Sequence, residues 1–284
     1  MPRRLPLLSD ESLRQTQERY REAVAARQRR NLIALAALVA LVAISAAVGE
    51  VSISKFVANI GNFTGYFERI LPSLRLQTLR SDLEDWMWNL PHWGRLLFDT
   101  LLMAYCGTLL GLAGGFALCF FAASNIMESG AVRFATRRFF EFCRSVPELV
   151  FALIFIFAFQ LGPVPGVLAI AIHTAGSLGK LFTEAVENVD RRPLESVSAC
   201  GAGWFGAVRF GVLPQVLPSF ASYGLLRFEV NVRGTSVIGF VGAGGIGQDL
   251  LEAIRTFQYS DVSAILVLIA TTVFAIDLAS EQIR

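Results

Sequence analysis

Residues 195–214 read ESVSACGAGWFGAVRFGVLP, a glycine-broken and partly polar stretch between long apolar runs. Its four glycines disfavour one long helix, because each costs about 1 kcal/mol relative to alanine inside a helix. We expect two short helices with a bend near residues 200–203, a start set by Asp190 and Pro193, and a second break at Pro214. A short helix pair outside the bilayer between two spans has the shape of a docking surface.

The composition predicts an all-α polytopic membrane protein. The chain has 284 residues, of which 54% are hydrophobic and 17% charged, and its mean hydropathy is +0.53. These values are too apolar for an ordinary soluble domain. The four cysteines lie in or beside apolar runs without C-x-x-C spacing, so we expect reduced packing residues, with neither a disulfide framework nor a metal site.

The N-terminal part predicts a cytoplasmic helix followed by a membrane span. Residues 1–31 carry eight arginines against four acids, with alternating charge typical of a solvated helix. Residues 32–49 are apolar and just long enough to span, so we assign them to the first transmembrane helix. A secretory signal is the competing interpretation, but its N-terminal region would be far too long. The arginines place the N-terminus in the cytoplasm.

Residues 50–94 are mixed in character and predict an extracytoplasmic loop. Three tryptophans near its end, Trp86, Trp88 and Trp93, suit an interfacial aromatic belt, with packing in a core as the alternative.

Five further apolar runs predict five more spans, at about residues 95–123, 146–161, 167–182, 216–232 and 262–278. The first of these contains Gly107, Gly111 and Gly115, whose spacing lets helices approach closely. A Gly-Pro break at residues 162–166 is expected to turn the chain outside. A basic loop around residues 133–144 returns it to the cytoplasm, where juxtamembrane arginines explain the charge better than nucleic-acid binding does. About six transmembrane helices then leave both termini in the cytoplasm.

The segment 239–247 is rich in glycine and matches a nucleotide-binding pattern by letters alone. Gly242-x-Gly244-x-x-Gly247 has meaning as a dinucleotide site only between a strand and a helix, and here it lies between membrane spans. A flexible turn is one alternative. We favour a gate loop in which Gly242, Gly244, Gly245 and Gly247 provide positive φ or close backbone approach.

No catalytic arrangement stands out in the sequence. There is no G-x-x-x-x-G-K-[ST] motif, so uphill transport with ATP would need a second chain to hydrolyse it. We find no nucleophile, paired-carboxylate or metal pattern, and His92 and His173 are isolated. The chain is therefore not expected to be an enzyme or to bind a cofactor itself.

Charged and polar residues inside the fifth span are candidates for a substrate path. Arg227 and Asn231 share one helical face, and Arg233 is expected to pair with Glu229 one turn before it. Arg227 lies about 20 Å along a helix that must cross about 30 Å, where a charge is a functional-site hypothesis. Snorkelling or pairing with an acid is the alternative. His173, in the fourth span, is a further candidate, for which a satisfied core histidine is the alternative.

The chain resembles the permeases of bacterial ABC importers. Glu195, Gly201 and Leu213-Pro214 are similar to the EAA signature of that family, although Ser196 and Val197 replace its two alanines and Gly211 replaces an aliphatic residue. Further matches resemble the PhnE family of phosphonate-importer permeases over residues 95–284. They are residues 144–148 (RSVPE), 162–166 (GPVPG), 173–180 (HTAGSLGK) and 239–247 (GFVGAGGIG).

The resemblance implies a type I (MetI-like) permease core at residues 95–284, with cytoplasmic coupling helices at residues 184–213. Two copies would sit in the bacterial cytoplasmic membrane on a dimer of ABC ATPase subunits, which hold ATP and Mg, and an extracytoplasmic solute-binding protein would deliver the solute. The EAA residues Glu195, Gly201, Leu213 and Pro214 would couple to the ATPase, and the gate loop would line the outer mouth.

The expected cargo is phosphonate or a related oxyanion, phosphate or phosphite, moved by alternating access. Compact oxyanions suit a few cationic residues equally well. A permease for another small solute and a secondary anion transporter remain alternatives, the latter with only Glu229 as a coupling acid.

Overall fold

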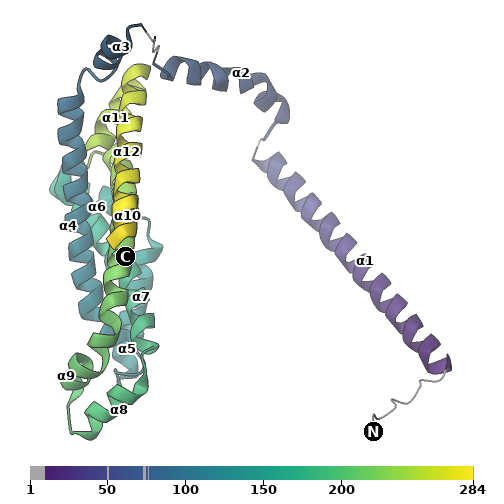
Figure 1. Cartoon of the computed structure of the whole chain (residues 1–284). Helices are drawn as coiled ribbons and strands as arrows, with labels where there is room; N and C mark the ends of the chain where they lie inside the picture. The colour runs from purple at the N-terminus through teal and green to yellow at the C-terminus, as the bar shows by residue number, and fades with distance from the viewer. Residues whose placement is uncertain (1–9, 50, 73–74, 76, 284) are drawn as a thin grey trace. The chain divides into compact units, whose positions relative to one another are not determined.

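The computed structural model describes residues 10–49, 51–72, 75 and 77–283, and this part of the chain is helical without a strand (Figure 1). It divides into two compact units, residues 1–66 and 67–284. The first nine residues of the predicted N-terminal helix (1–31) and the last residue of the predicted core (95–284) lie outside the described residues.

The first unit contains one long helix where the sequence predicted two segments. Helix α1 runs without interruption over Asp10–Val48 and includes the candidate span Gln17–Val48. Its apolar side chains are exposed, as expected where lipid would cover them. Helix α2, Ile53–Ile70, follows, so the predicted loop 50–94 begins with a helix.

The second unit is a bundle of helices. Its main elements are α3 Leu79–Trp86, α4 Leu90–Ala122, α5 Gly130–Ser145, α6 Glu148–Phe159, α7 Pro163–Glu187, α8 Arg191–Ala199, α9 Trp204–Gly206, α10 Leu213–Ile238, α11 Ile246–Arg255 and α12 Tyr259–Ile283. A π-helical turn, η1 Ala207–Val212, precedes α10, and a 3₁₀ turn, η2 Gly239–Val241, follows it. In Figure 1, α3 lies at one end of this bundle and α8 and α9 at the other.

Helices α4 and α7 pack closely because glycines line their contact, as the spacing predicted. A Cβ placed on Gly107 would lie 2.7 Å from the Cβ of Ile170, and one on Gly111 would lie 2.5 Å from that of Thr174. Gly115 meets the backbone of Gly179 in the same way. The small residues therefore let the two helix backbones touch.

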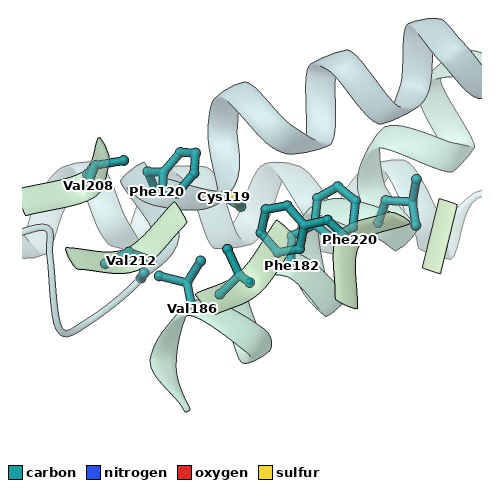
Figure 2. Packing of buried hydrophobic residues seen from close by; sticks show 10 residues of the cluster. Cys119, Phe120, Phe182, Val186, Val208, Val212 and Phe220 are labelled. Carbon is teal, nitrogen blue, oxygen red and sulfur yellow. The ribbon is translucent and has the colours of Figure 1, made fainter. Parts of the chain in front are cut away.

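An apolar core joins α4, α7, η1 and α10 near the α8 end of the bundle (Figure 2). Phe182 stacks on Phe220 with ring centroids 3.9 Å apart. Cys119 and Val212, both inaccessible to solvent, pack in the same cluster. Cys119 and the buried Cys143 are the packing residues that the sequence predicted, whereas Cys106 and Cys200 are exposed.

The number of candidate spans agrees with the prediction, but the third span has a different construction. Among the described residues, four helices are long and apolar enough to cross a membrane, and the number rises to six if each of two bent pairs is one span. Helix α6 alone has 12 residues, about 18 Å, so the predicted third span of residues 146–161 is too short. Together with α5, which meets α6 at an angle of 88°, it forms a bent pair, either a broken span or a re-entrant loop.

The turn between the third and fourth spans also lies earlier than predicted. It occupies residues 160–162, where Gln160 and Gly162 have positive φ, and Pro163 already belongs to the first turn of α7. Proline is tolerated there because its missing N–H would have no helical partner.

Residues 246–255 form a packed helix, α11. The apolar residues Ile246, Leu250 and Ala253 of α11 recur at helical spacing and pack in a core with Trp93. Trp93 is 2% exposed, and the indole N–H of Trp86 donates to the Ser263 hydroxyl at 2.9 Å. The predicted aromatic belt is therefore wrong for these two tryptophans, which are packing residues.

Candidate functional site

The stretch 195–214 folds as a short helix, a sharp bend and a second helix. Asp190 caps α8, its carboxylate accepting from the Arg192 N–H at 3.0 Å. The helix ends at Ala199, and Gly201, two residues on with a φ of 78°, donates its N–H to the Ser198 carbonyl and closes the C-cap in left-handed conformation. The predicted bend near residues 200–203 is confirmed, and Glu195 is exposed on α8.

The second break predicted at Pro214 is wrong. The backbone stays helical through η1 into α10, with Val212 and Leu213 in right-handed helical conformation. The π-helical turn explains this, because the missing N–H of Pro214 falls where the hydrogen-bond register of the helix changes. Pro214 is exposed and Leu213 partly buried at the start of α10.

The beginning of α8 is tied directly to α10. The side chain of Gln215 accepts from the Asp190 N–H at 3.1 Å, and its amide group donates to the carbonyls of Asp190 at 3.3 Å and Gly211 at 2.6 Å. Leu194 of α8 packs over Gly211. These contacts link the start of α8 to the same helix that carries Arg227 and Asn231.

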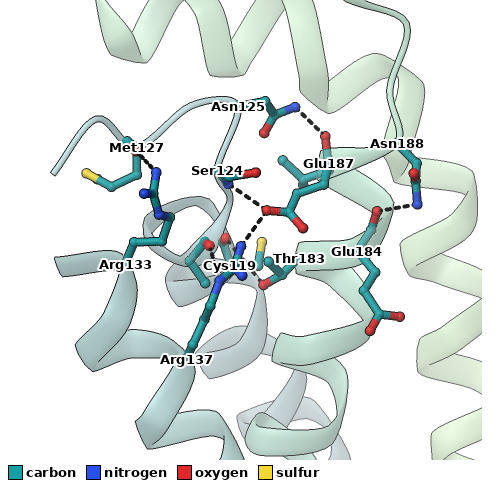
Figure 3. Close-up of polar contacts among 12 residues, drawn as sticks. Cys119, Ser124, Asn125, Met127, Arg133, Arg137, Thr183, Glu184, Glu187 and Asn188 are labelled. Atoms are coloured by element: carbon teal, nitrogen blue, oxygen red, sulfur yellow. Dashed lines mark hydrogen bonds and ion pairs between the residues drawn. The ribbon is translucent and has the colours of Figure 1, made fainter. Parts of the chain in front are cut away.

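A polar network joins the ends of α4 and α7 to α5 (Figure 3). Arg137 forms an ion pair with Glu187 at 2.5 Å and donates to the Ala122 carbonyl at 2.9 Å. Glu187 also accepts from the Ser124 N–H at 2.7 Å, and Asn125 donates to the Val186 carbonyl. These bonds hold the ends of α4 and α7 against the middle of α5, so Arg137 has a structural role.

Two predicted polar residues, His173 of α7 and Arg227 of α10, contact each other. A guanidinium nitrogen of Arg227 is 2.5 Å from His173 Nδ1. Arginine can only donate, so Nδ1 accepts and the ring is neutral with its proton on Nε2. The carboxylate of Glu148, at the start of α6, is 3.8 Å from the same ring and close enough to attract Arg227. His173 therefore has a hydrogen-bond partner, and the acid Glu148 lies near Arg227 without an ion pair between them among the described residues.

Asn231 lies one turn beyond Arg227 and is 1% exposed. Its amide nitrogen donates to the hydroxyls of Thr108 on α4 at 2.8 Å and Thr174 on α7 at 2.9 Å. We call Glu148, His173, Arg227 and Asn231 the polar cluster. The polar cluster joins α6, α7 and α10, and the hydrogen bond from Asn231 to Thr108 connects it to α4.

Arg233 lies apart from the polar cluster. It pairs with Glu229, as the spacing predicted, and its guanidinium is 3.7 Å from Asp277 of α12. The Arg233 side chain is 49% exposed and links α10 to α12 through these acids. It does not contact the other three candidates, Arg227, Asn231 and His173.

The glycine segment is tightly packed. Gly242, Gly244 and Gly245 all have positive φ, and a Cβ on Gly247 would overlap the Ser236 carbonyl oxygen. Beside it the Ile246 N–H donates to the Thr100 hydroxyl at 2.9 Å. The predicted need for unusual backbone and close approach is observed, and a flexible turn is not.

The chain matches a known family over most of this region. The family model for the inner membrane component of binding-protein-dependent transport systems covers residues 115–283. The chain belongs to this family.

Several characterised permeases are similar to this one. The phosphite transport system permease protein PtxC of Stutzerimonas stutzeri is 41% identical over 68% of this chain and 70% of its own length. The phosphate-import permease protein PhnE of Mycolicibacterium smegmatis is 40% identical, over 67% of this chain and 36% of its own. A putative cryptic phosphonate transport system permease protein of Escherichia coli, PhnE2, is 50% identical over 41% of this chain and 96% of its own.

Solved structures support the permease fold. The MetNI methionine ABC transporter in an inward-facing conformation is similar with a TM-score of 0.59, covering 70% of this chain and 96% of the other at 20% identity. A bacterial alginate ABC transporter gives a TM-score of 0.54 at 14% identity, covering 86% and 92%. Both comparisons show the fold of a type I importer permease.

Sequence reasoning missed three residues in and around the polar cluster of the permease. Glu148, Thr108 and Thr174 belong to α6, α4 and α7, and their proximity to α10 is not visible in local periodicity. The signal available for Glu148 was an acid at the very start of an apolar run, inside the RSVPE motif at residues 144–148.

Proposed function

We propose that this permease is the membrane subunit of an ATP-driven importer for phosphonate or a related oxyanion, phosphate or phosphite. The observation that carries the proposal is the shared chemistry of its relatives, whose names specify phosphite, phosphate and phosphonate at 40–50% identity. An arginine at the centre of the bundle, on a helix linked to α8, agrees with a compact anion as cargo.

The proposed complex contains two copies of the permease, a dimer of ATPase subunits and an extracytoplasmic solute-binding protein. ATP and Mg belong to the ATPase, and both termini of the permease lie in the cytoplasm. Glu195 and Gly201 on the α8 side present the surface that the ATPase contacts, since Glu195 is exposed at the end of the bundle away from α3 (Figure 1).

ATP binding in the partner moves α8, and the Gln215 and Gly211 contacts carry this movement into α10. Arg227, Asn231 and His173 line the path of the anion. The segment of Gly242, Gly244, Gly245 and Gly247 gates the outer end. Arg233 supports α10 against α12 through its acidic partners.

Transport into proteoliposomes tests the proposal. The permease is reconstituted with its ATPase and binding protein, and uptake of phosphate, phosphite and methylphosphonate is measured with and without internal or external ATP. Uptake of at least one of these anions that requires ATP on the ATPase side is expected. Uptake driven by an ion gradient without ATP would instead identify a secondary transporter, and ATP-dependent uptake of an unrelated solute alone would reject the oxyanion cargo.

A further inference from the structure

The polar cluster contains one donor and one acceptor that lack partners. Within the described residues, Arg227 Nε and Asn231 Oδ1 are buried and make no hydrogen bond. Both atoms belong to one face of α10, a single turn apart. Buried polar atoms normally have hydrogen-bond partners. A bound ligand with both a donor and an acceptor would supply the partners that these two atoms lack.

The orientation of the Asn231 amide follows from its neighbours. The hydroxyl of Thr108 already donates to the Ala104 carbonyl at 2.6 Å, so its oxygen must accept from Asn231. The amide nitrogen therefore faces Thr108 and Thr174, and the oxygen is the free end. The cluster thus presents an acceptor there.

Glu148 adds a second acceptor. Its carboxylate lies over Gly234 of α10, where the missing side chain leaves it room, and in the ionised form it only accepts hydrogen bonds. The His173 ring lies 3.8 Å from the Glu148 carboxylate and accepts a hydrogen bond from Arg227. The ring is therefore neutral and does not offset the charge of the carboxylate. The cluster is therefore a cation flanked by acceptors on α6 and α10.

We propose that this cluster binds an oxyanion that still carries a proton and that Glu148 and Asn231 select such anions against fully deprotonated ones. The inference rests on the proposed function, because α6, α7 and α10 must separate during transport for the anion to reach the buried atoms. A P–O⁻ oxygen accepts from Arg227, and a P–OH group donates to an acceptor of the cluster. Sulfate offers only acceptors at neutral pH, so it would face the carboxylate and leave Asn231 unsatisfied.

Direct binding to the permease–ATPase complex tests this, without the binding protein and its own selectivity. Radiolabelled inorganic phosphate and radiolabelled sulfate are compared by equilibrium dialysis at neutral pH. The unmodified complex should bind phosphate at least about tenfold more tightly than sulfate, the size expected from one unsatisfied buried acceptor. In Glu148→Gln the carboxamide can donate to sulfate, so the ratio should fall toward one, and Arg227→Gln should weaken both anions.

The matched control is Glu141→Gln on α5, whose carboxylate pairs with Arg138 outside the cluster. It should keep the ratio of the unmodified complex. Equal binding of both anions by the unmodified complex, no binding of phosphate, or an unchanged ratio in Glu148→Gln would each overturn the inference. ATP-dependent uptake alongside such a result would leave the proposed function standing, whereas loss of all oxyanion uptake would reject the function itself.

Discussion

Leu194 of α8 lies against the bare Cα of Gly211 in η1, so closely that a Cβ added to Gly211 would come within 3.1 Å of the Leu194 Cα. The contact explains why a glycine stands where the resemblance led us to expect an aliphatic residue. It also makes Gly211 the point at which α8 touches the helix that it is proposed to move.

Gly211→Val should therefore uncouple ATP hydrolysis from transport. The branched side chain must push α8 away from η1, because the atoms it meets belong to the backbone as well as the side chain of Leu194. We expect ATP-driven uptake in proteoliposomes to fall about tenfold or more, with the permease still in the membrane. Gly203→Val is the control, since a Cβ there meets nothing within 4 Å. Equal loss in both variants would contradict a specific role for the Leu194 contact.

Gly201 should tolerate substitution poorly for a different reason. Its φ of 78° is left-handed, which costs about 1–2 kcal/mol for most other residues. Gly201→Asp should abolish uptake and ATPase stimulation while leaving membrane insertion intact, and Glu195→Ala should do the same by removing an exposed contact. Normal uptake in both variants would falsify the coupling role of α8. Gly201→Asn, which accepts left-handed backbone more readily, should retain more activity than Gly201→Asp.

The membrane helices and the α8 bend could be predicted because their signals are local. Apolar runs of sufficient length, the cap at Asp190 and the glycine at 201 each act within a few residues. The face shared by Arg227 and Asn231 was likewise visible, since helical periodicity alone places them together.

Contacts between helices could not be predicted in the same way. Trp93 is buried because α11 folds back on it, and the amphipathic pattern of residues 246–255 was hidden by a polar average composition. Glu148 joins His173 and Arg227 only through the packing of α6, α7 and α10. The smooth helix across Pro214 depended on a π-helical turn, for which the sequence carries no simple pattern.

Arg137→Gln should reduce the stability of the α8 end of the bundle. The variant loses the ion pair with Glu187 and weakens the link to the Ala122 carbonyl. Both side chains are partly exposed, so we expect a loss of about 1 kcal/mol, seen as a drop of a few degrees in the Tm of the detergent-purified permease. Arg138→Gln, which loses an exposed ion pair and a cation–π contact with Phe134, both within α5, should leave the Tm nearly unchanged. Equal shifts in the two variants would contradict the structural role of Arg137.

The glycine segment offers two alanine substitutions that separate steric overlap from backbone strain. Gly247→Ala places its Cβ on the Ser236 carbonyl oxygen, which belongs to the backbone of α10, so α10 and α11 must move apart. Gly244→Ala meets no atom within 4 Å and carries only the strain of a φ of 85°. We expect Gly247→Ala to lower both the Tm and the uptake severely. Gly244→Ala should cost about 1–2 kcal/mol of stability and keep measurable uptake. If the segment moves as a rigid unit between α10 and α11, a disulfide that joins it to α4 should lock the transporter in one conformational state and stop uptake. If Gly247→Ala transports as well as Gly244→Ala, the close contact with Ser236 does not persist in the membrane and the segment is a flexible turn after all.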